Sequence, residues 1–362
     1  MNRYIKEIER SKKYLQITFA FLLIATSLNF HADENTPEIE KEKSEKTAEV
    51  KKDKKNEKKE YKSIEEFIED GNYEKVEGFM NILHETEKDK YYLIIEKNKL
   101  NKEFIYFTYI LNGPQAVGAS GGSLGEGYIL EFRKFKDDIG LYKINTKFTY
   151  DEPNKITQSK LTNIIEAFMG RFKVEVKEED RFLISADKLF LSEILTSVTP
   201  NIPREYEEYY DLNLGKLDKE KTYIADIRNY PKNTAVEINY GFFNAKPKPS
   251  ASVDAVADKR YTFISARHLF VEMPDDEFEP RVADQRVGYF SQKVTDLSTY
   301  DTYPARDLMN RWRLVKKNPD AELSEPEEPI VFWVENSTPQ EIRPFVVKGI
   351  EGWNVAFEKA GF

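Results

Sequence analysis

The sequence contains no cysteine, and only three of its 362 residues are histidine: His31, His84 and His268. The absence of cysteine excludes disulfides, thiolate zinc sites, iron–sulfur clusters, cysteine nucleophiles and lipid attachment through cysteine. The three histidines lie far apart in the sequence, and a three-histidine metal site would need all of them. These absences argue against a self-contained metalloenzyme, so we expect no metal-binding residue in this chain.

An excess of positive charge is also missing. The chain carries 55 Lys and Arg residues against 64 Asp and Glu residues, which gives a net charge of −9. Nucleic-acid binding depends on cations that replace condensed counterions, so we predict no nucleic-acid partner. Hydrophobic residues make up 40% of the chain, which is enough to bury a core.

No apolar run is long enough to cross a bilayer as a helix. The longest N-terminal run, from Ile17 to Leu28, spans about 12 residues instead of the ~20 that a membrane span needs. It follows a basic region, and this pattern predicts a signal peptide over residues 1–32 and export to the periplasm or the cell exterior. The alternative is an uncleaved membrane anchor over residues 14–30, which would be the only membrane contact.

Residues 33–62 differ in composition from the rest of the chain. They contain ten acidic and ten basic residues and almost nothing apolar. Such a segment cannot bury a core, so we predict a charged, disordered linker.

Residues 63–328 have the pattern of a globular α+β domain with mainly antiparallel strands and a few amphipathic helices. The expected strands are Tyr91–Glu96, Glu103–Leu111, Tyr128–Lys134, Gly140–Phe148, Phe172–Val176, Phe182–Ile184, Lys221–Asn229, Ala235–Phe243, Tyr261–Phe270 and Val287–Val294. The expected helices are Ile64–Asp70, Leu161–Phe168 and Asp187–Leu195.

Local motifs predict no catalytic residue. His84-Glu85 begins like the zinc motif H-E-x-x-H, but Lys88 stands where the second histidine belongs. The glycine cluster of residues 113–127 lacks the lysine of a phosphate-binding loop and leads into a strand, so we expect a wide loop with positive φ angles. His268 lies in a strand pattern with no second ligand nearby, which favours a structural role.

One polar cluster is a candidate site. Arg281, Asp284 and Arg286 occur within the dense polar stretch of residues 279–290. They predict either a structural, buried ion network or a binding site in which Arg281 holds a carboxylate through two hydrogen bonds.

The last 34 residues predict a strand followed by one amphipathic helix. Residues 330–334 are β-branched or aromatic and precede Glu335, and Thr338-Pro-Gln-Glu341 reads as a capping box with proline at the first helical position. Apolar residues then recur at helical spacing, and Gly361 is placed to end the helix.

Four sequence blocks resemble a known family. They are Gly113–Gly125, Phe278–Phe290, Arg311–Leu314 and Pro329–Phe362. They are similar, in matching order, to blocks of large secreted bacterial zinc-dependent metalloproteases, in which a domain of unknown function precedes a metzincin-type catalytic domain. The resemblance covers roughly residues 63–362.

This resemblance implies that residues 329–362 are the opening strand and helix of a truncated metzincin-like catalytic domain. It also implies that the zinc motif follows Phe362, so zinc belongs to the full-length family and no catalytic or metal-binding position falls in this chain. We therefore expect the N-terminal, non-catalytic portion of an exported metallopeptidase-like protein, inactive by itself. The alternative is a naturally short exported protein that uses the 63–328 domain to bind a peptide or a protein partner.

Overall fold

The computed structural model describes residues 59–125, 127–149, 163–203, 205, 212–248, 253–275, 278–299 and 301–362. Residues 59–362 constitute one structural unit. The predicted signal peptide or anchor and nearly all of the predicted charged linker lie outside the described residues.

The first sheet has five antiparallel strands and is covered by a short helix. In spatial order the strands are β1 (Tyr73–Val76), β2 (Asn81–Glu85), β3 (Lys90–Glu96), β10 (Arg181–Ser185) and β9 (Val174–Lys177). Helix α2 (Ile64–Glu69) is capped by the Ser63 hydroxyl, which accepts a hydrogen bond from the Glu66 backbone N–H. Its buried residues Ile64 and Phe67 pack on Leu83 of this sheet.

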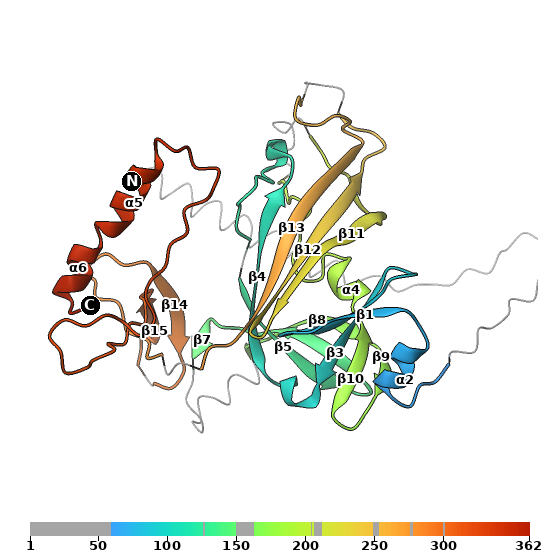
Figure 1. Ribbon diagram of the computed structural model, residues 1–362, viewed down its shortest axis with the longest axis horizontal. Coiled ribbons are helices and arrows are strands. Elements are labelled where there is room, and N and C mark those ends of the chain that lie inside the picture. Colours follow the sequence, from blue (N-terminus) through green and yellow to red (C-terminus); the bar gives the residue numbers. More distant parts are fainter. Residues whose placement is uncertain are drawn as a thin grey trace, which may run out of the picture. The chain divides into compact units, whose positions relative to one another are not determined.

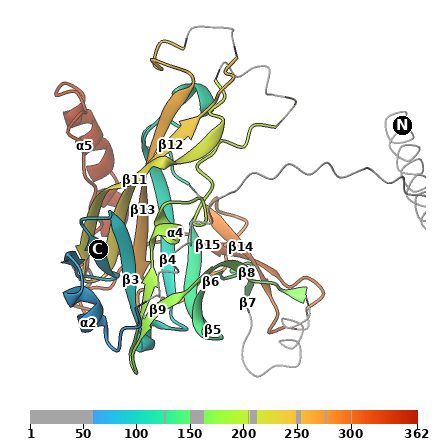
Figure 2. The same cartoon turned by 90° about the vertical axis from the view of Figure 1, so that its right-hand side faces the viewer.

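The second sheet has seven antiparallel strands and curls into a half-barrel (Figures 1 and 2). In spatial order the strands are β11 (Lys216–Tyr230), β12 (Asn233–Phe243), β13 (Tyr261–Glu272), β4 (Glu103–Asn112), β5 (Tyr128–Phe135), β6 (Asp138–Lys143) and β8 (Ala167–Phe172). Alternate residues of β13 are buried, as the two-residue period of a strand with one covered face requires.

The main hydrophobic core joins these two sheets. Leu93 and Ile95 of β3 belong to the same buried cluster as Tyr106, Tyr240 and Phe270 of the seven-stranded sheet. The short helix α4 (Asp187–Phe190) contributes two further buried side chains to this cluster.

A third, small sheet consists of β15 (Ala305–Met309), β14 (Ser291–Asp296) and β7 (Phe148–Thr149). Strand β14 is antiparallel to β15 and parallel to β7. The remaining helical elements are η1 (Lys97–Lys99), η2 (Gln115–Val117), α5 (Arg343–Glu351) and α6 (Asn354–Lys359). The prediction of mainly antiparallel strands with few helices is confirmed.

Two predicted helices differ from the structure. Phe168, expected on a helix, lies in strand β8, where its ring packs on those of Phe135 and Tyr142; most of this predicted helix lies outside the described residues. The helix predicted to reach Leu195 ends at Phe190. There the Ser192 hydroxyl donates to the Lys188 carbonyl at 2.7 Å, which replaces a helical backbone bond.

The end of the chain also differs from its prediction. Residues 330–335 form no strand, and no strand among the described residues pairs with them. The helix begins at Arg343 instead of at the proposed capping box, and its N-cap residue Ile342 offers no capping side chain. Pro344 occupies the first turn, where a proline is tolerated. The single predicted helix is divided into α5 and α6 between Glu351 and Asn354. Gly361, with a φ of 94°, follows the end of α6.

Candidate functional site

The polar cluster predicted from the sequence does not form a buried network. Asp284 and Arg286 pair at 2.5 Å, but the Arg286 side chain is 88% exposed. The Arg286 guanidinium lowers the pKa of the Asp284 carboxyl through this contact. Arg281 is exposed and forms no ion pair with any residue that the structure describes, so only two of the three side chains meet.

The two described histidines have structural partners. His84 lies in strand β2, stacks on Tyr91 at 4.4 Å between ring centroids, and contacts the Asp89 carboxylate at 2.9 Å. A strand does not place residues four apart as a helix does, so His84-Glu85 lacks the geometry of the zinc motif. His31 lies outside the described residues.

His268 is fully buried between two tyrosines of the seven-stranded sheet. Its Nδ1 lies 2.8 Å from the Tyr106 hydroxyl, and its Nε2 lies 2.9 Å from the Tyr240 hydroxyl. Burial lowers the pKa of His268 to about 3 and raises the pKa of both tyrosines. All three side chains therefore stay neutral at pH 7. Their hydrogen bonds link strands β4, β13 and β12.

The glycine-rich loop between β4 and β5 folds back along β4. Gly118 and Gly122 have φ angles of 79° and 84°, which confirms the predicted positive φ values. The backbone N–H of Gly125 donates to the Thr108 carbonyl at 2.8 Å. The backbone N–H groups of Gly122 and Gly125 thus pair with strand β4, and those of Gly118 and Ala119 pair within the loop, so these N–H groups do not converge on one point as in a phosphate-binding loop.

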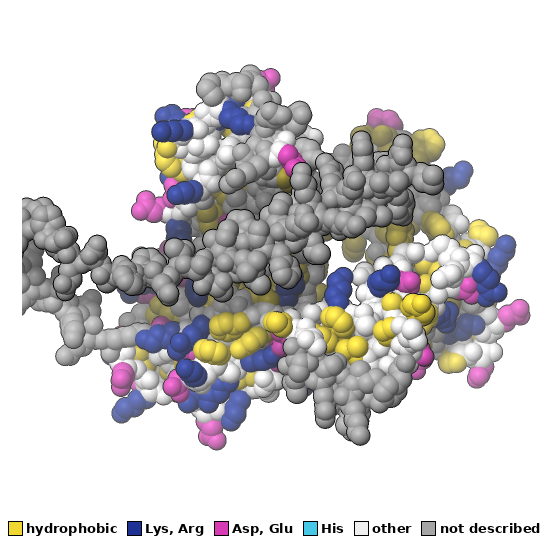
Figure 3. Space-filling model, turned by 180° about the vertical axis from the view of Figure 1, so that it is seen from behind, with side chains coloured by type: hydrophobic (Ala, Val, Ile, Leu, Met, Phe, Trp, Pro, Cys, Tyr) yellow, Lys and Arg dark blue, Asp and Glu magenta, His cyan; other side chains and the backbone are white. Residues whose placement is uncertain are grey.

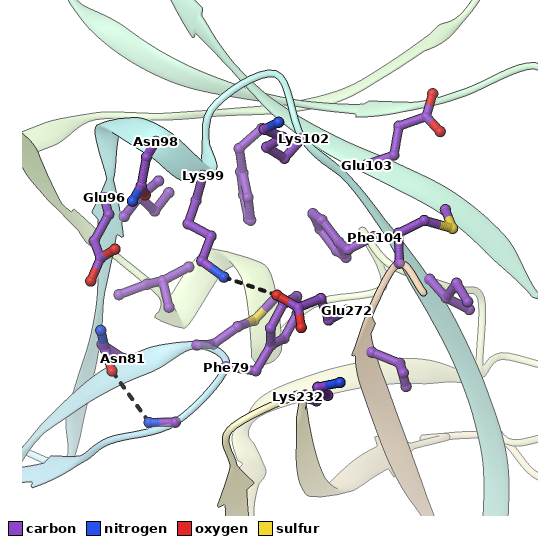
Figure 4. Close-up of a pocket in the computed structure, with 18 of the residues that line it drawn as sticks. Phe79, Asn81, Glu96, Asn98, Lys99, Lys102, Glu103, Phe104, Lys232 and Glu272 are labelled. Atoms are coloured by element: carbon purple, nitrogen blue, oxygen red, sulfur yellow. Dashed lines mark hydrogen bonds and ion pairs between the residues drawn. The ribbon is translucent and has the colours of Figure 1, made fainter. Parts of the chain in front are cut away.

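A pocket lies between the five-stranded and seven-stranded sheets, and we call it the intersheet pocket (Figure 4). Its volume is about 840 Å³, within the range of ligand sites in proteins. The lining residues come from the β1–β2 turn, β3, η1, β4, β5 and the end of β13. The continuous stretch from β3 to the start of β4 meets the distant end of β13 here because the two sheets share one core.

The floor of the intersheet pocket is apolar and aromatic. Leu93, Ile95, Phe104 and Phe132 line it and are each at most 5% exposed. The rings of Phe104 and Phe132 stack at 5.5 Å, and Phe79 meets Phe104 edge to face at 6.2 Å. The floor can therefore take up apolar groups of a ligand.

The rim of the pocket carries both signs of charge. The lysines are Lys99, Lys102 and Lys232, and the acids are Glu96, Glu103, Glu272 and Asp275. Lys99 Nζ lies 3.5 Å from Glu272 Oε1 and 5.1 Å from the Phe79 ring centroid, directly over the floor (Figure 4). Both side chains of this ion pair are about two-fifths exposed, at 43% and 42%, so the pair is weak.

One wall of the pocket is fixed by a junction between the sheets. The Asn229 amide donates to the Val76 and Met80 carbonyls at 2.8 and 2.5 Å. The backbone N–H of Met80 donates to the buried Thr234 hydroxyl at 3.0 Å. These bonds hold the β1–β2 turn, and with it Phe79, against the seven-stranded sheet.

Sequence reasoning missed the intersheet pocket. The Lys99–Glu272 pair spans 173 positions, and no local motif signals such a contact. The one available signal was the alternation of apolar residues in β3 and β4, which shows that these strands bury one face but does not show where that face is left uncovered.

No group of three or more potential metal ligands occurs among the described residues. Nor is any helix in that part of the chain long and apolar enough to cross a membrane.

Residues 121–317 match the family described as "Domain of unknown function (DUF5117)". The match contains Phe132, Lys232 and Glu272 of the pocket. It begins after β4, so it includes strands β9 and β10 of the five-stranded sheet but not strands β1 to β3. No curated protein and no solved structure matches the chain.

Proposed function

The chain belongs to the family of the domain of unknown function DUF5117, and we propose that it is the non-catalytic, N-terminal portion of an exported protein related to zinc-dependent metallopeptidases. The proposal includes the metzincin-like origin of residues 329–362. Its support is the ordered resemblance of four sequence blocks together with the exposure of the last of these blocks.

The observation that carries the proposal is the unburied apolar surface of residues 329–362. Trp333 is 92% exposed, Phe345 is 75% exposed and Trp353 is 68% exposed. Neither α5 nor α6 buries a single residue, although apolar side chains recur along both. Monomeric proteins rarely leave such surface open, so a further domain that covers it accounts for the pattern.

The described residues do not fit a zinc site. His84 is engaged by Tyr91 and Asp89, and His268 is enclosed by two tyrosine hydroxyls. We therefore assign no zinc ligand and no reaction step to this chain, and zinc enters the proposal only through the resemblance.

The test has a biochemical part and a genetic part. The isolated chain should neither hydrolyse peptide bonds nor bind zinc tightly, as measured with a fluorogenic peptide library and by zinc titration. Sequencing of the gene beyond the codon for Phe362 should find H-E-x-x-H in a continuing frame. Tight one-to-one zinc binding by the chain, or unrelated sequence after that codon, would contradict the proposal.

A binding role for the same domain is the second candidate, and the intersheet pocket favours it. Its preformed walls and apolar floor have the character of ligand sites. An edge-strand mode, in which an extended peptide pairs with an outer strand such as β1 or β11, is the alternative route to peptide binding.

A further inference from the structure

We propose that the intersheet pocket binds short peptides that end in apolar residues, with the free C-terminal carboxylate held by its lysines. This inference rests on the second candidate function, binding by the domain, and does not depend on the relationship to metallopeptidases.

The size and the floor of the pocket suit several apolar side chains at once. Its volume of about 840 Å³ exceeds what a single apolar side chain would fill. The rings of Phe79, Phe104 and Phe132 contact one another in series, and the half-buried Phe79 offers most of their accessible surface because Phe104 and Phe132 are each 5% exposed. Burial of apolar side chains on this surface would supply the main part of the affinity.

Lys99 is placed to bind a carboxylate above this floor. An ammonium group has three N–H donors, and the contact with Glu272 at 3.5 Å uses one of them weakly. The Lys99 ammonium also lies 5.1 Å from the Phe79 ring centroid, in a cation–π contact. A ligand carboxylate can therefore join Lys99 without breaking a strong bond.

Two further lysines can contact the ligand carboxylate, while the four acids against three lysines leave the rim as a whole negative. Lys102 and Lys232 also line the pocket, and neither forms an ion pair with another residue in the described ranges. Of the four rim acids, Glu272 is already paired with Lys99, and the side chain of Glu103 points away from that pair (Figure 4).

The remaining rim groups favour a peptide over a fatty acid. Glu96 and Asp275 accept hydrogen bonds, and Asn81 and Asn98 can both donate and accept them. Peptide N–H and C=O groups would satisfy these side chains, whereas an alkyl chain would cover them and leave them without partners. The mixed rim therefore matches the backbone of a short peptide.

The experiment measures binding by isothermal titration calorimetry to the full chain. The probes are N-acetyl-Leu-Leu-Leu with a free carboxylate, its C-terminal amide, and decanoate. We expect the free acid to bind at least tenfold more tightly than the amide and more tightly than decanoate. Replacement of the exposed Lys99 by glutamine (Lys99→Gln) should weaken binding of the free acid about tenfold and leave binding of the amide unchanged.

Two controls separate the pocket from the rest of the surface. Lys293 is an exposed lysine of β14 outside the pocket, and Lys293→Gln should not change any affinity. Asn98→Trp places a bulky ring at the exposed rim and should reduce the binding of both peptides. Equal affinity for acid and amide, stronger binding of decanoate, or no binding of either peptide would overturn the inference. None of these outcomes bears on the gene sequence or on zinc, so failure here is distinguishable from failure of the metallopeptidase proposal.

Discussion

Two regions of this chain have similar patterns of apolar residues but differ in whether these residues are buried. In the sheet body, residues 59–275, Phe270 is 1% exposed and belongs to a core that joins both large sheets. In the C-terminal segment, residues 310–362, Phe345 is 75% exposed and no residue is buried. Apolar residues at a regular spacing therefore predict a helix or strand, but they do not predict whether that element is buried.

The surface of the molecule shows the same contrast in composition. Figure 3 shows one face, on which hydrophobic side chains are interspersed with lysine and arginine side chains. Single exposed apolar side chains are ordinary on a folded protein. The C-terminal segment is different, because Trp312, Trp333 and Trp353 are each at least 61% exposed within one short stretch.

The largest predicted effect on stability is found by replacing one phenylalanine with alanine in each region. Phe270→Ala should lower the free energy of unfolding by about 3–5 kcal/mol, because it leaves a cavity in the main core. Phe345→Ala should change it by less than about 0.5 kcal/mol, because the ring is already solvated. Urea unfolding followed by far-UV circular dichroism measures both. A comparable loss at Phe345 would show that the C-terminal segment is packed.

The second effect is a pH dependence of the free energy of unfolding, which arises from His268 in the sheet body. The pKa of His268 is about 3 in the folded chain against 6.5 as its ordinary value, so protonation favours the unfolded state. The stability contributed by the buried, neutral His268 is complete above pH 6.5 and is lost as the pH falls from 6.5 toward 3. The slope should reach about 1.4 kcal/mol per pH unit within that window.

His268→Gln removes the titrating group and keeps a hydrogen-bonding side chain at this position. The variant should be less stable at pH 7 but should show a flatter decline between pH 6 and 4, measured by urea unfolding at each pH. An unchanged slope would mean that other groups control the acid sensitivity of the body.

The third effect compares two glycines. A Cβ at Gly78 would lie 2.3 Å from Asn229 Oδ1 and 2.9 Å from the Tyr230 carbonyl oxygen, so Gly78→Ala should destabilise the junction of the two sheets by about 1–3 kcal/mol. A Cβ at Gly349 would meet nothing within 4 Å, so Gly349→Ala should only raise the helix content of α5. Thermal unfolding and circular dichroism distinguish the two, and a neutral Gly78→Ala would argue against a tight junction.

The smallest effect is expected at the predicted polar cluster. Arg286→Gln removes a surface pair with Asp284, and solvent and salt screen such pairs strongly. The unfolding midpoint should stay within experimental error of the parent value. A clear drop in that midpoint would restore the interpretation that this cluster is structural.

The sequence predicted the strands well where the residues themselves decide the structure. β3, β4, β5, β12 and β13 appear close to their expected bounds, because alternation and β-branched or aromatic residues specify a half-buried strand. Prediction failed where a partner decides it. Phe168 joins β8 because β6 is available to pair with it, and residues 330–335 form no strand because nothing pairs with them.

The candidate site was beyond sequence reasoning for the same reason. The intersheet pocket exists because Phe79, Lys99 and Glu272 arrive from three segments that only the tertiary fold brings together. The polar cluster was detectable, since Asp284 and Arg286 are two residues apart, but its exposure was not. Local motifs report local contacts, whereas the Lys99–Glu272 contact of this pocket joins residues 173 positions apart.

The most direct test of the contrast between the two regions uses the tryptophans. All three tryptophans of the chain lie in the C-terminal segment, so intrinsic tryptophan fluorescence reports on that segment alone. We predict that the folded chain emits at the wavelength of solvated tryptophan, that acrylamide quenches it as efficiently as the urea-unfolded chain, and that urea shifts the emission little. A blue-shifted, protected emission that moves to the red on unfolding would show that the C-terminal segment has a buried partner within this chain, and would contradict the account.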